Sequence, residues 1–306
     1  MKALRVMRCA LLLMVLHGLW FPAGVFAWSR FAHETVGHLA EADLSPIARI
    51  AVADLLDGQS LAAVGSWADE VRSERPETAP LHYVNGPLDI VVPSDSDLNL
   101  PQGTVYSAVL GYSQILADTR LPRIERVEAL KFLVHFLADL HQPLHSGFSE
   151  DRGANDVPVI YRGELINLHR YWDDQIFAKI QEDFASRGFA AVLRSRHGLT
   201  ERRAWAVQSP REWVIEARQL IFSGLYPRPR RGVLGEVSPE ALPPGLIEPI
   251  AVMDQNYRTV WQPVAEVQVA RAGARLAATL NAIFESGRSP FQAPRHAFPP
   301  TPVPPT

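Results

Sequence analysis

The stretch from Ala129 to Asp174, ALKFLVHFLADLHQPLHSGFSEDRGANDVPVIYRGELINLHRYWDD, contains the features that decide the fold. It begins as a nearly continuous apolar helix candidate, and its few polar residues follow one another at spacings of three or four. These polar residues are Lys131, His135, Asp139 and Gln142. Residues three and four apart lie on one face of a helix. We therefore expect a helix that is apolar on most sides and polar along one stripe.

A second set of metal-binding residues follows this helix. His145 comes just after a proline ends the helix, and His169 and Asp173 form a histidine and carboxylate pair four residues apart. With His135 and Asp139, five side chains that can bind a metal fall within 39 residues. One such pair is most often a surface hydrogen bond, but apolar neighbours predict burial here, where an unpaired carboxylate is costly. Zinc binds imidazole nitrogen and carboxylate oxygen, so the pattern favours a metal site.

The N-terminus has the pattern of a secretory signal peptide at residues 1–27. A basic start precedes an apolar run at residues 10–20, and the small-residue sequence Val25-Phe26-Ala27 predicts cleavage before Trp28. The apolar run is too short to span a bilayer, and no later segment approaches the necessary length. We therefore expect a secreted or periplasmic protein without a membrane span in its mature form.

The charge and the cysteine content limit the class of protein further. The chain has 30 basic and 33 acidic residues, and loss of three basic residues with the signal leaves a net charge of about −6. A broad basic surface is thus excluded, so metal ions or scattered arginines would have to meet the phosphates of a nucleic acid. The only cysteine, Cys9, lies in the signal. A mature chain without disulfides is typical of a bacterial enzyme large enough for a full core.

Helical spacing of apolar residues predominates along the mature chain, and strand patterns are sparse. The expected helical segments are 28–56 with a break at 45–46, 61–75, 105–118, 123–142, 165–187, 200–226 with an interruption at Pro210, and 246–284 with a bend or restart at Pro263. A short strand or extended connection is expected at 81–85, and an irregular excursion or small hairpin at 145–164. We predict one all-α domain at 28–287 and a proline-rich disordered tail at 288–306.

Seven motifs along the mature chain, taken together, resemble those of the S1/P1 nuclease family. They are W-x4-H beginning at Trp28, S-W-A-D-E-V-R at 66–72, H-Y-V-N at 82–85, H-F-x-x-D-x-H-Q-P-L-H at 135–145, a degraded G-G-N at 153–155, N-L-H-x-x-W-D at 167–173, and A-G-x-R-L-A-x-x-L-N at 272–281. The resemblance covers essentially the whole mature chain. It implies a mainly helical domain of the phospholipase C/P1 nuclease type with three zinc ions in a cleft, and no protein partner is implied.

The resemblance also implies which residues bind each zinc ion. The implied ligands of the first ion are Asp69, His82, His135 and Asp139. Asp139 would bridge to the second ion, whose other ligands are His33 and Trp28. Trp28 would bind through its own carbonyl oxygen and through the α-amino nitrogen that signal cleavage frees. The implied ligands of the third ion are His145, His169 and Asp173.

The activity that the resemblance implies is hydrolysis of single-stranded DNA and RNA to 5′-phosphorylated products, with 3′-nucleotides as further substrates. A hydroxide that bridges two zinc ions would attack phosphorus, which makes their ligands Asp69 and Asp139 catalytic, while the third ion and a cation would stabilise the leaving oxyanion. Arg72, close beyond Asp69, is the expected cation. The alternative is a surface arginine that pairs with Glu70 or Glu74.

Three residues are expected to contact the substrate. Tyr83 and Asn85 occupy positions where the resemblance implies a base pocket, and Tyr83 offers an aromatic face for stacking. Fungal members of the family carry Phe and Asp there. Asn85 both donates and accepts, so we expect weaker discrimination among bases. Asn155 is expected to touch substrate as well, but Ala154 stands where the family usually has glycine, and only glycine accepts a positive φ freely.

Two other interpretations are open. A zinc-dependent phospholipase C of the same fold is the main alternative, although its last zinc ligand is usually glutamate where this chain has Asp173. The other is a non-catalytic helical protein with structural zinc, but such sites are typically closed sets of four ligands and prefer cysteine. His141 is expected to be a packing or supporting histidine rather than a zinc ligand.

Overall fold

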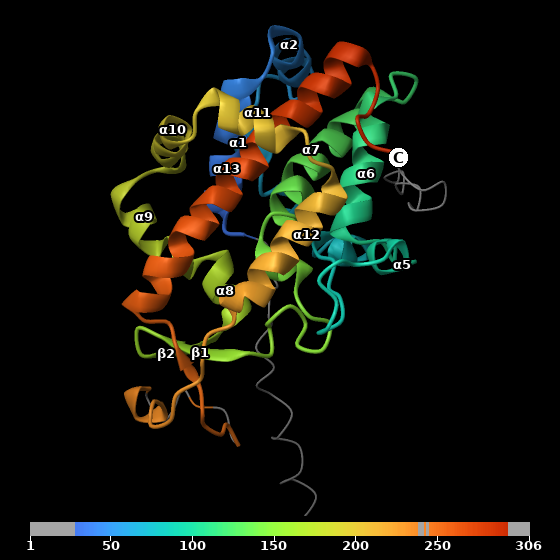
Figure 1. Cartoon of the computed structure of the whole chain (residues 1–306). Coiled ribbons are helices and arrows are strands. Elements are labelled where there is room, and N and C mark those ends of the chain that lie inside the picture. The colour runs from blue at the N-terminus through green and yellow to red at the C-terminus, as the bar shows by residue number, and fades with distance from the viewer. Residues whose placement is uncertain (1–27, 238–241, 243–244, 293–306) are drawn as a thin grey trace, which may run out of the picture.

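Helices make up most of the chain in the computed structural model, which describes residues 28–237, 242 and 245–292 (Figure 1). The α-helices are α1 (Arg30–Asp43), α2 (Pro46–Leu55), α3 (Leu61–Val64), α4 (Trp67–Glu70), α5 (Asp95–Leu98), α6 (Val105–Ala117), α7 (Arg123–Asp139), α8 (Leu168–Asp173), α9 (Ala178–Asp183), α10 (Ser186–Arg196), α11 (Leu199–Ala206), α12 (Pro210–Leu220) and α13 (Gln255–Ser286). Short helical turns are η1 (Pro76–His82), η2 (Pro143–Ser146), η3 (Gln175–Phe177), η4 (Ile221–Leu225) and η5 (Leu234–Glu236). The mainly helical fold is as predicted; the signal at 1–27 and the tail beyond residue 292 lie outside the described residues.

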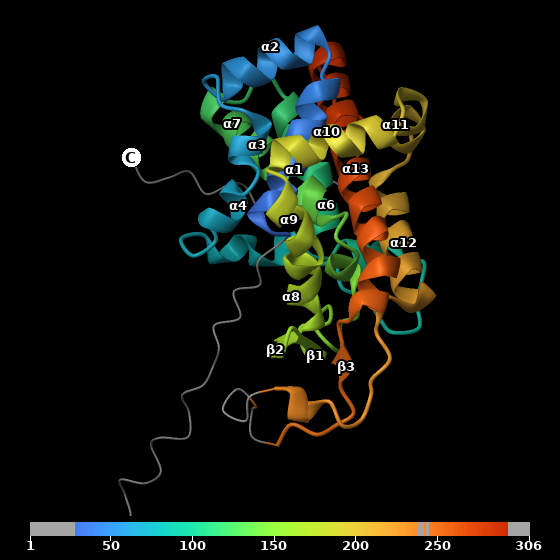
Figure 2. The ribbon, with the colours of Figure 1, turned by 90° about the vertical axis from the view of Figure 1, so that its left-hand side faces the viewer.

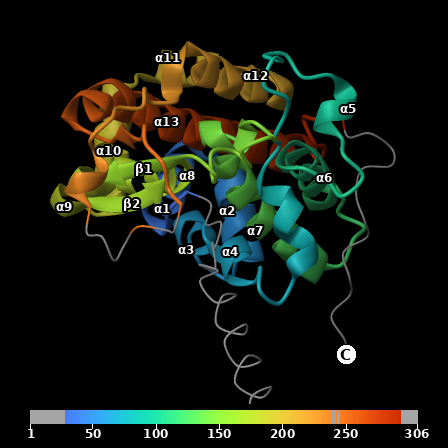
Figure 3. The ribbon, with the colours of Figure 1, turned by 90° about the horizontal axis from the view of Figure 1, so that it is seen from below.

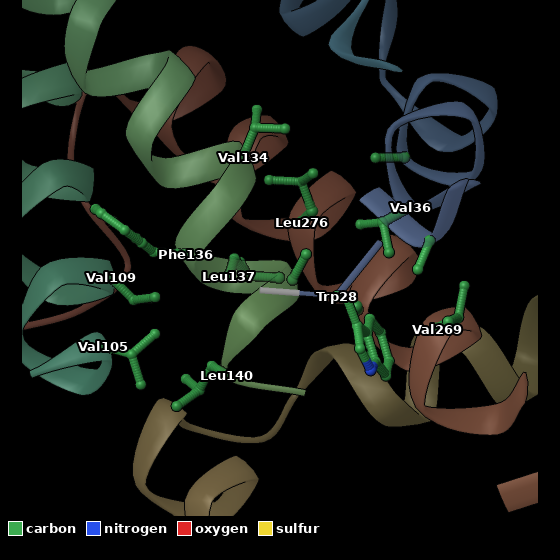
Figure 4. Packing of buried hydrophobic residues seen from close by; sticks show 14 of the residues in the cluster. Trp28, Val36, Val105, Val109, Val134, Phe136, Leu137, Leu140, Val269 and Leu276 are labelled. Carbon is green, nitrogen blue, oxygen red and sulfur yellow. The ribbon is translucent and has the colours of Figure 1, made fainter. Parts of the chain in front are cut away.

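Helix α7 lies at the centre of the core. Its second half, from Ala129 to Asp139, is buried except at Lys131, because the helix is apolar on nearly every side. It packs against α1, α6 and α13, and Figure 3 shows it beside α6. Figure 4 shows Trp28 among the apolar side chains that α1, α7 and α13 contribute. The expected polar stripe therefore lies in the protein interior from His135 to Gln142, whereas Lys131 is partly exposed.

A small three-stranded sheet lies at one end of the helical layers (Figure 2). Its strands are β1 (Pro158–Tyr161), β2 (Glu164–Asn167) and β3 (Ala251–Val252), in the order β2-β1-β3. The antiparallel hairpin β1-β2 pairs Tyr161 with Glu164 across a turn at Arg162 and Gly163, both of which have positive φ. The expected hairpin in this region is thus present. It leads directly into α8, whose start is capped by the side chain of Asn167.

The prediction of a helix over residues 165–187 is wrong at the start of that range. Leu165 lies in β2, and the segment then divides into α8, η3 and α9 because the backbone leaves the helical region at Asp174 and again at Phe184. The helix predicted at 61–75 is likewise divided, into the single turns α3 and α4. The extended connection expected at 81–85 begins only at Tyr83, because η1 continues to His82.

The last predicted helix starts later than expected. Residues 246–254 include β3, and α13 begins at Gln255, where the Asp254 side chain accepts from the Tyr257 N–H as a cap. Pro263 does not restart the helix, since α13 runs unbroken to Ser286. Proline removes one backbone hydrogen bond, and the packing of α13 against α1 and α7 outweighs that loss. In the described part of the chain, no helix is both long and apolar enough to cross a membrane.

Candidate metal centre and substrate groove

Histidine and carboxylate side chains from six separate elements meet in three groups. Within each group, one ligand atom from every residue lies within 4.8 Å of the others. The His33 group is His33, His135 and Asp139; the His82 group is Asp69, His82 and His135; the His169 group is His145, His169 and Asp173. The eight His and Asp residues that the sequence singled out as ligands are therefore all brought together.

Asp139 lies where the groups meet. Its Oδ2 is 3.0 Å from His82 Nδ1 and 3.1 Å from His135 Nε2. Its Oδ1 is 3.4 Å from His33 Nε2 and 3.8 Å from His145 Nδ1. The two oxygens of one buried carboxylate thus face different groups, as a bridging ligand requires.

Backbone carbonyls orient two of the imidazole rings. His135 Nδ1 donates to the carbonyl of Gly65 at 2.8 Å, and His169 Nδ1 donates to the carbonyl of Gly153 at 2.6 Å. In the neutral form of each ring, the proton therefore lies on Nδ1, and Nε2 keeps a lone pair that points into its group. Such bonds hold the tautomer and the ring plane that metal binding needs.

The chemistry of these groups fits a metal ion. Several of their buried polar atoms have no hydrogen-bond partner among the described residues: His33 Nδ1 and Nε2, Asp69 Oδ1, His82 Nε2, Asp139 Oδ1, His145 Nδ1 and Nε2, and His169 Nε2. Buried polar groups are normally paired, because an unpaired one costs free energy. Imidazole nitrogens and carboxylate oxygens without cysteine are ligands that zinc accepts.

Burial and mutual charge shift the pKa values of the groups strongly. Burial lowers the pKa of His82 to about 4. Burial also opposes the charged form of His135, but the carboxylates of Asp139 and Asp69 raise its pKa to about 9. Burial raises the pKa of Asp173 to about 7. In the apoprotein, the protonation of each histidine and carboxylate thus depends on burial and on the charges of its neighbours. Bound cations would therefore change these pKa values.

Trp28 lies beside this centre. It is fully buried, with its ring edge-on to Phe177 at a centroid distance of 6.1 Å. The next residue, Ser29, donates its N–H to the carbonyl of Asp173 at 2.7 Å. The contact ties the start of the predicted mature chain to α8. The ligand role of the Trp28 α-amino nitrogen stays a prediction.

A groove of 410 Å³ adjoins the His169 group and contains all the residues predicted to contact substrate. Its lining residues are Arg72, Pro80, Tyr83, Val84, Asn85, Leu100, Gln102, Gly103, Thr104, Ser149, Arg152, Asn155 and His169. The Tyr83 residue is 36% exposed, so its ring is accessible for stacking. Arg72 is half-buried. Glu70, which the alternative prediction paired with Arg72, forms an ion pair with Arg30 at 2.6 Å.

The loop at 151–155 forms one wall of this groove. Arg152, Gly153 and Ala154 all have positive φ, at 55°, 65° and 67°. Ala154 therefore keeps the left-handed conformation that glycine would adopt more easily, at a cost of about 1 kcal/mol. The Asp151 side chain accepts from the Ala154 N–H at 2.7 Å, and Asn155 Nδ2 donates to the Arg152 carbonyl at 2.8 Å. The alanine does not remove the loop's turn.

Backbone hydrogen bonds join the groove segment 84–86 to the segment 145–147, which contains His145 of the His169 group. The Val84 N–H donates to the carbonyl of His145 at 2.7 Å, and the Gly86 N–H donates to the carbonyl of Gly147 at 3.0 Å. Arg218, nearly fully buried, donates to the carbonyls of Ser146 and Gly147 at 3.0 Å. The segment with Tyr83 and Asn85 is thereby set beside η2.

Sequence reasoning missed two residues of this region. Arg152 lines the groove and pairs with Asp156, and its place beside the degraded G-G-N motif was the available signal. Gln142, noted only as a member of the polar stripe, is buried and bonded to Asp173. His141 belongs to none of the three groups; its Nδ1 donates to the Leu137 carbonyl, and its Nε2 accepts from Arg275. That arrangement is the supporting role expected of it.

Comparison with known proteins identifies the family. The family model described as S1/P1 Nuclease matches residues 28–285. The chain is 28% identical over 281 residues to Endonuclease 2 of Arabidopsis thaliana, covering 87% of this chain and 93% of that one. It is 28% identical over 283 residues to Nuclease P1 of Penicillium citrinum, covering 85% and 98%. It is 29% identical over 274 residues to Nuclease S1 of Aspergillus oryzae, covering 84% and 92%.

These matches favour the nuclease over the phospholipase C alternative. The family model spans most of the chain, and the chain covers nearly the full length of these relatives. The catalytic class is therefore that of a hydrolase acting on nucleic acid. The chain is a nuclease and belongs to the S1/P1 nuclease family.

Proposed function

We propose that this protein is a zinc-dependent phosphodiesterase that hydrolyses single-stranded DNA and RNA to 5′-phosphorylated products and also accepts 3′-nucleotides. The observation that carries the proposal is the contact between the metal-binding groups and the groove, since His169 belongs to both. A groove with an arginine, an accessible aromatic ring and amide side chains suits a chain of phosphates and bases. The predicted signal at 1–27 supports a secreted or periplasmic location.

The ligand assignment that we propose uses three ions. The first would be held by Asp69, His82, His135 and Asp139, the second by Asp139, His33 and Trp28, and the third by His145, His169 and Asp173. The position of Asp139, with its oxygens facing His82 and His33, supports its bridging role. The burial of Trp28 beside α8 supports a ligand role for the start of the mature chain.

The proposed mechanism assigns a task to each residue of the groove. Zinc held in these groups would supply a nucleophile from water near neutral pH and positive charge for the phosphate oxygens. Arg72 binds the phosphate and stabilises the charge that develops on the departing 3′-oxygen. Tyr83 stacks on a base, and Asn85 and Asn155 bond to substrate polar groups. Stacking accepts every base, which suits an enzyme for unpaired strands.

The decisive experiment compares two forms of the protein, one beginning at Trp28 and one with a single extra residue before it. Zinc content is measured by elemental analysis, and both forms are assayed on denatured DNA and on phosphatidylcholine. About three zinc ions with DNA cleavage in the first form, and less zinc and activity in the second, are expected. Full activity of the extended form would overturn the Trp28 assignment alone. Zinc without DNA cleavage, together with phosphatidylcholine hydrolysis, would overturn the proposed substrate.

A further inference from the structure

Gln142 joins two members of the His169 group through one side chain. It is fully buried and lies three residues after the last residue of α7. Its Nε2 donates to Asp173 Oδ1 at 2.8 Å, and its Oε1 accepts from the Leu144 N–H at 2.6 Å. Both polar ends of the amide are therefore occupied.

The direction of these two bonds is forced. The backbone N–H of Leu144 can only donate, so the amide oxygen of Gln142 must face it. The amide nitrogen must then face Asp173, and it can only donate to the carboxylate. With Oδ1 held in this way, Asp173 turns its other oxygen, Oδ2, toward His169 Nε2 at 3.3 Å. The hydrogen bond thus sets the rotation of the carboxylate within the group.

The same side chain also sets the backbone that carries His145. Gln142 is the N-cap residue of η2, and the bond to the Leu144 N–H satisfies a donor that the first turn of a helix leaves unpaired. His145 is the third residue of η2. Its Nε2 lies 3.6 Å from Asp173 Oδ1, the oxygen that Gln142 holds. One buried amide therefore positions a histidine and a carboxylate that approach from different elements.

We propose that Gln142 is a positioning residue for the metal ion of the His169 group. It holds Asp173 through its donor, it holds the backbone turn that carries His145 through its acceptor bond to the Leu144 N–H, and it binds no metal itself. This inference rests on the proposed metal binding. Loss of a residue that orients metal ligands typically lowers metal affinity by about 10- to 100-fold. The effect should fall on one ion only, because the side chain of Gln142 hydrogen-bonds to no residue of the His33 or His82 groups. Its backbone N–H donates to the carbonyl of Asp139 at 2.9 Å, a bond that a change of the side chain leaves in place.

The test measures zinc retention in the loaded protein with Gln142→Leu and Gln142→Glu. Gln142→Leu removes both hydrogen bonds. Gln142→Glu keeps an acceptor for the Leu144 N–H and, when ionised, replaces the donor to Asp173 with a like charge, so it preserves the cap and removes the bond to the carboxylate. Gln268→Leu is the matched control, because Gln268 is equally buried on α13 and belongs to none of the three groups. His169→Ala shows the zinc content expected when the ion of the His169 group alone is lost.

Each protein is equilibrated with zinc at a series of buffered free concentrations, and bound zinc per chain is counted by elemental analysis. Both Gln142 variants should lose one ion at about 10- to 100-fold higher free zinc than wild type and Gln268→Leu. Circular dichroism checks folding, and Gln142→Glu keeps the test decisive if Gln142→Leu does not fold. Retention of all ions at wild-type affinity by the folded variants would overturn the proposal. Absence of DNA cleavage by zinc-loaded wild type would instead count against the proposed function, because zinc retention is measured without substrate.

Discussion

Asp139 Oδ2 lies 3.0 Å from His82 Nδ1, although the two residues stand 57 positions apart in the sequence and both side chains are buried. The second oxygen of the same carboxylate faces His33 across 3.4 Å. One negative charge therefore serves two groups at once. Its removal should affect more than one ion.

The substitution Asp139→Asn keeps the shape of the side chain but removes its charge. We expect the zinc content to fall by about two ions per chain and the rate of DNA cleavage to fall about a thousandfold or more, which corresponds to about 4 kcal/mol. Asp118→Asn, at a surface carboxylate that pairs with Arg120, should change neither quantity. Elemental analysis and a cleavage assay on denatured DNA provide the two readouts. Full zinc content in Asp139→Asn would refute the bridging role.

The pH dependence of the apoprotein's stability should reveal the state of His135. Its pKa in the folded apoprotein is about 9, above the ordinary 6.5, so the folded chain holds a proton that the unfolded chain releases. The stability that this proton contributes is fully present below pH 6.5 and is lost as the pH rises through 9. We expect the free energy of unfolding in a chelator to fall by about 1.4 kcal/mol per pH unit between pH 7 and 9.

Denaturant unfolding of the apoprotein between pH 7 and 9 measures this slope. His135→Asn should flatten it, since that variant has no proton to lose. Zinc binding requires deprotonated histidines, so added zinc should stabilise the protein more as the pH rises. A wild-type slope equal to that of His135→Asn would contradict the raised pKa.

A methyl group at Gly153 should disturb the groove. Gly153 has φ +65°, and an added Cβ would lie 2.6 Å from the Leu144 carbonyl oxygen and 3.1 Å from Asn85 Oδ1. Gly58 has φ +81°, but a Cβ there meets nothing within 4 Å. Gly58→Ala should cost about 1 kcal/mol from backbone strain alone and leave catalysis unchanged. Gly153→Ala should cost at least about 2 kcal/mol and raise KM for DNA. Equal effects of the two substitutions on unfolding and on KM would show that the groove does not depend on this close approach.

Arg72→Gln should separate substrate charge stabilisation from metal binding. We expect kcat on denatured DNA to fall by about 10²- to 10³-fold, since removing one group that stabilises developing charge has that effect. Zinc content should remain unchanged, because no group of metal-binding residues includes Arg72. Arg203→Gln, at an exposed arginine of α11 that does not line the groove, is the control. Cleavage by Arg72→Gln at the wild-type rate would rule out the proposed role.

Base preference should depend on residue 85. Asn85 presents both a donor and an acceptor at the groove, so the wild type should cleave the four homopolymers at rates within about tenfold of one another. Asn85→Asp leaves an acceptor only and should sharpen the preference for bases that donate. Initial rates on the four single-stranded homopolymers measure this. A strong wild-type preference that disappears in Asn85→Asp would be the opposite of the expected result.

The sequence predicted the elements with a clear apolar period and missed those decided by tertiary contacts. The helix predicted at 123–142 is present as α7, which ends at Asp139, because the second half of this helix is apolar on nearly every side and requires burial. The segment after Glu164 has similar apolar spacing, yet Leu165 pairs with Ile160 in the hairpin. A short apolar run fits a strand or a helix equally well, and the turn at Arg162 and Gly163 decided between them.

The candidate site could be predicted as a set of residues but not as a geometry. His135 and Asp139 were recognisable because one helical turn places both on one face. Asp139 faces His33 because α1 packs beside α7, and the spacing of residues in the sequence does not contain that information. The hydrogen bonds of Gln142 were hidden for the same reason: its partner Asp173 lies 31 positions away.

The hydrogen bond between Ser29 and Asp173 joins the start of the described chain to a helix more than half-way along the mature sequence. We expect contacts of such long sequence separation to form late, because a large loop must close first. The metal-binding groups need the same late arrangement, so a partly folded chain offers no complete set of ligands. Interactions absent from the folding transition state act on the unfolding rate. Bound metal should thus slow the unfolding of the protein without speeding its folding. The survival of the folded protein under denaturing conditions would then depend on its unfolding rate.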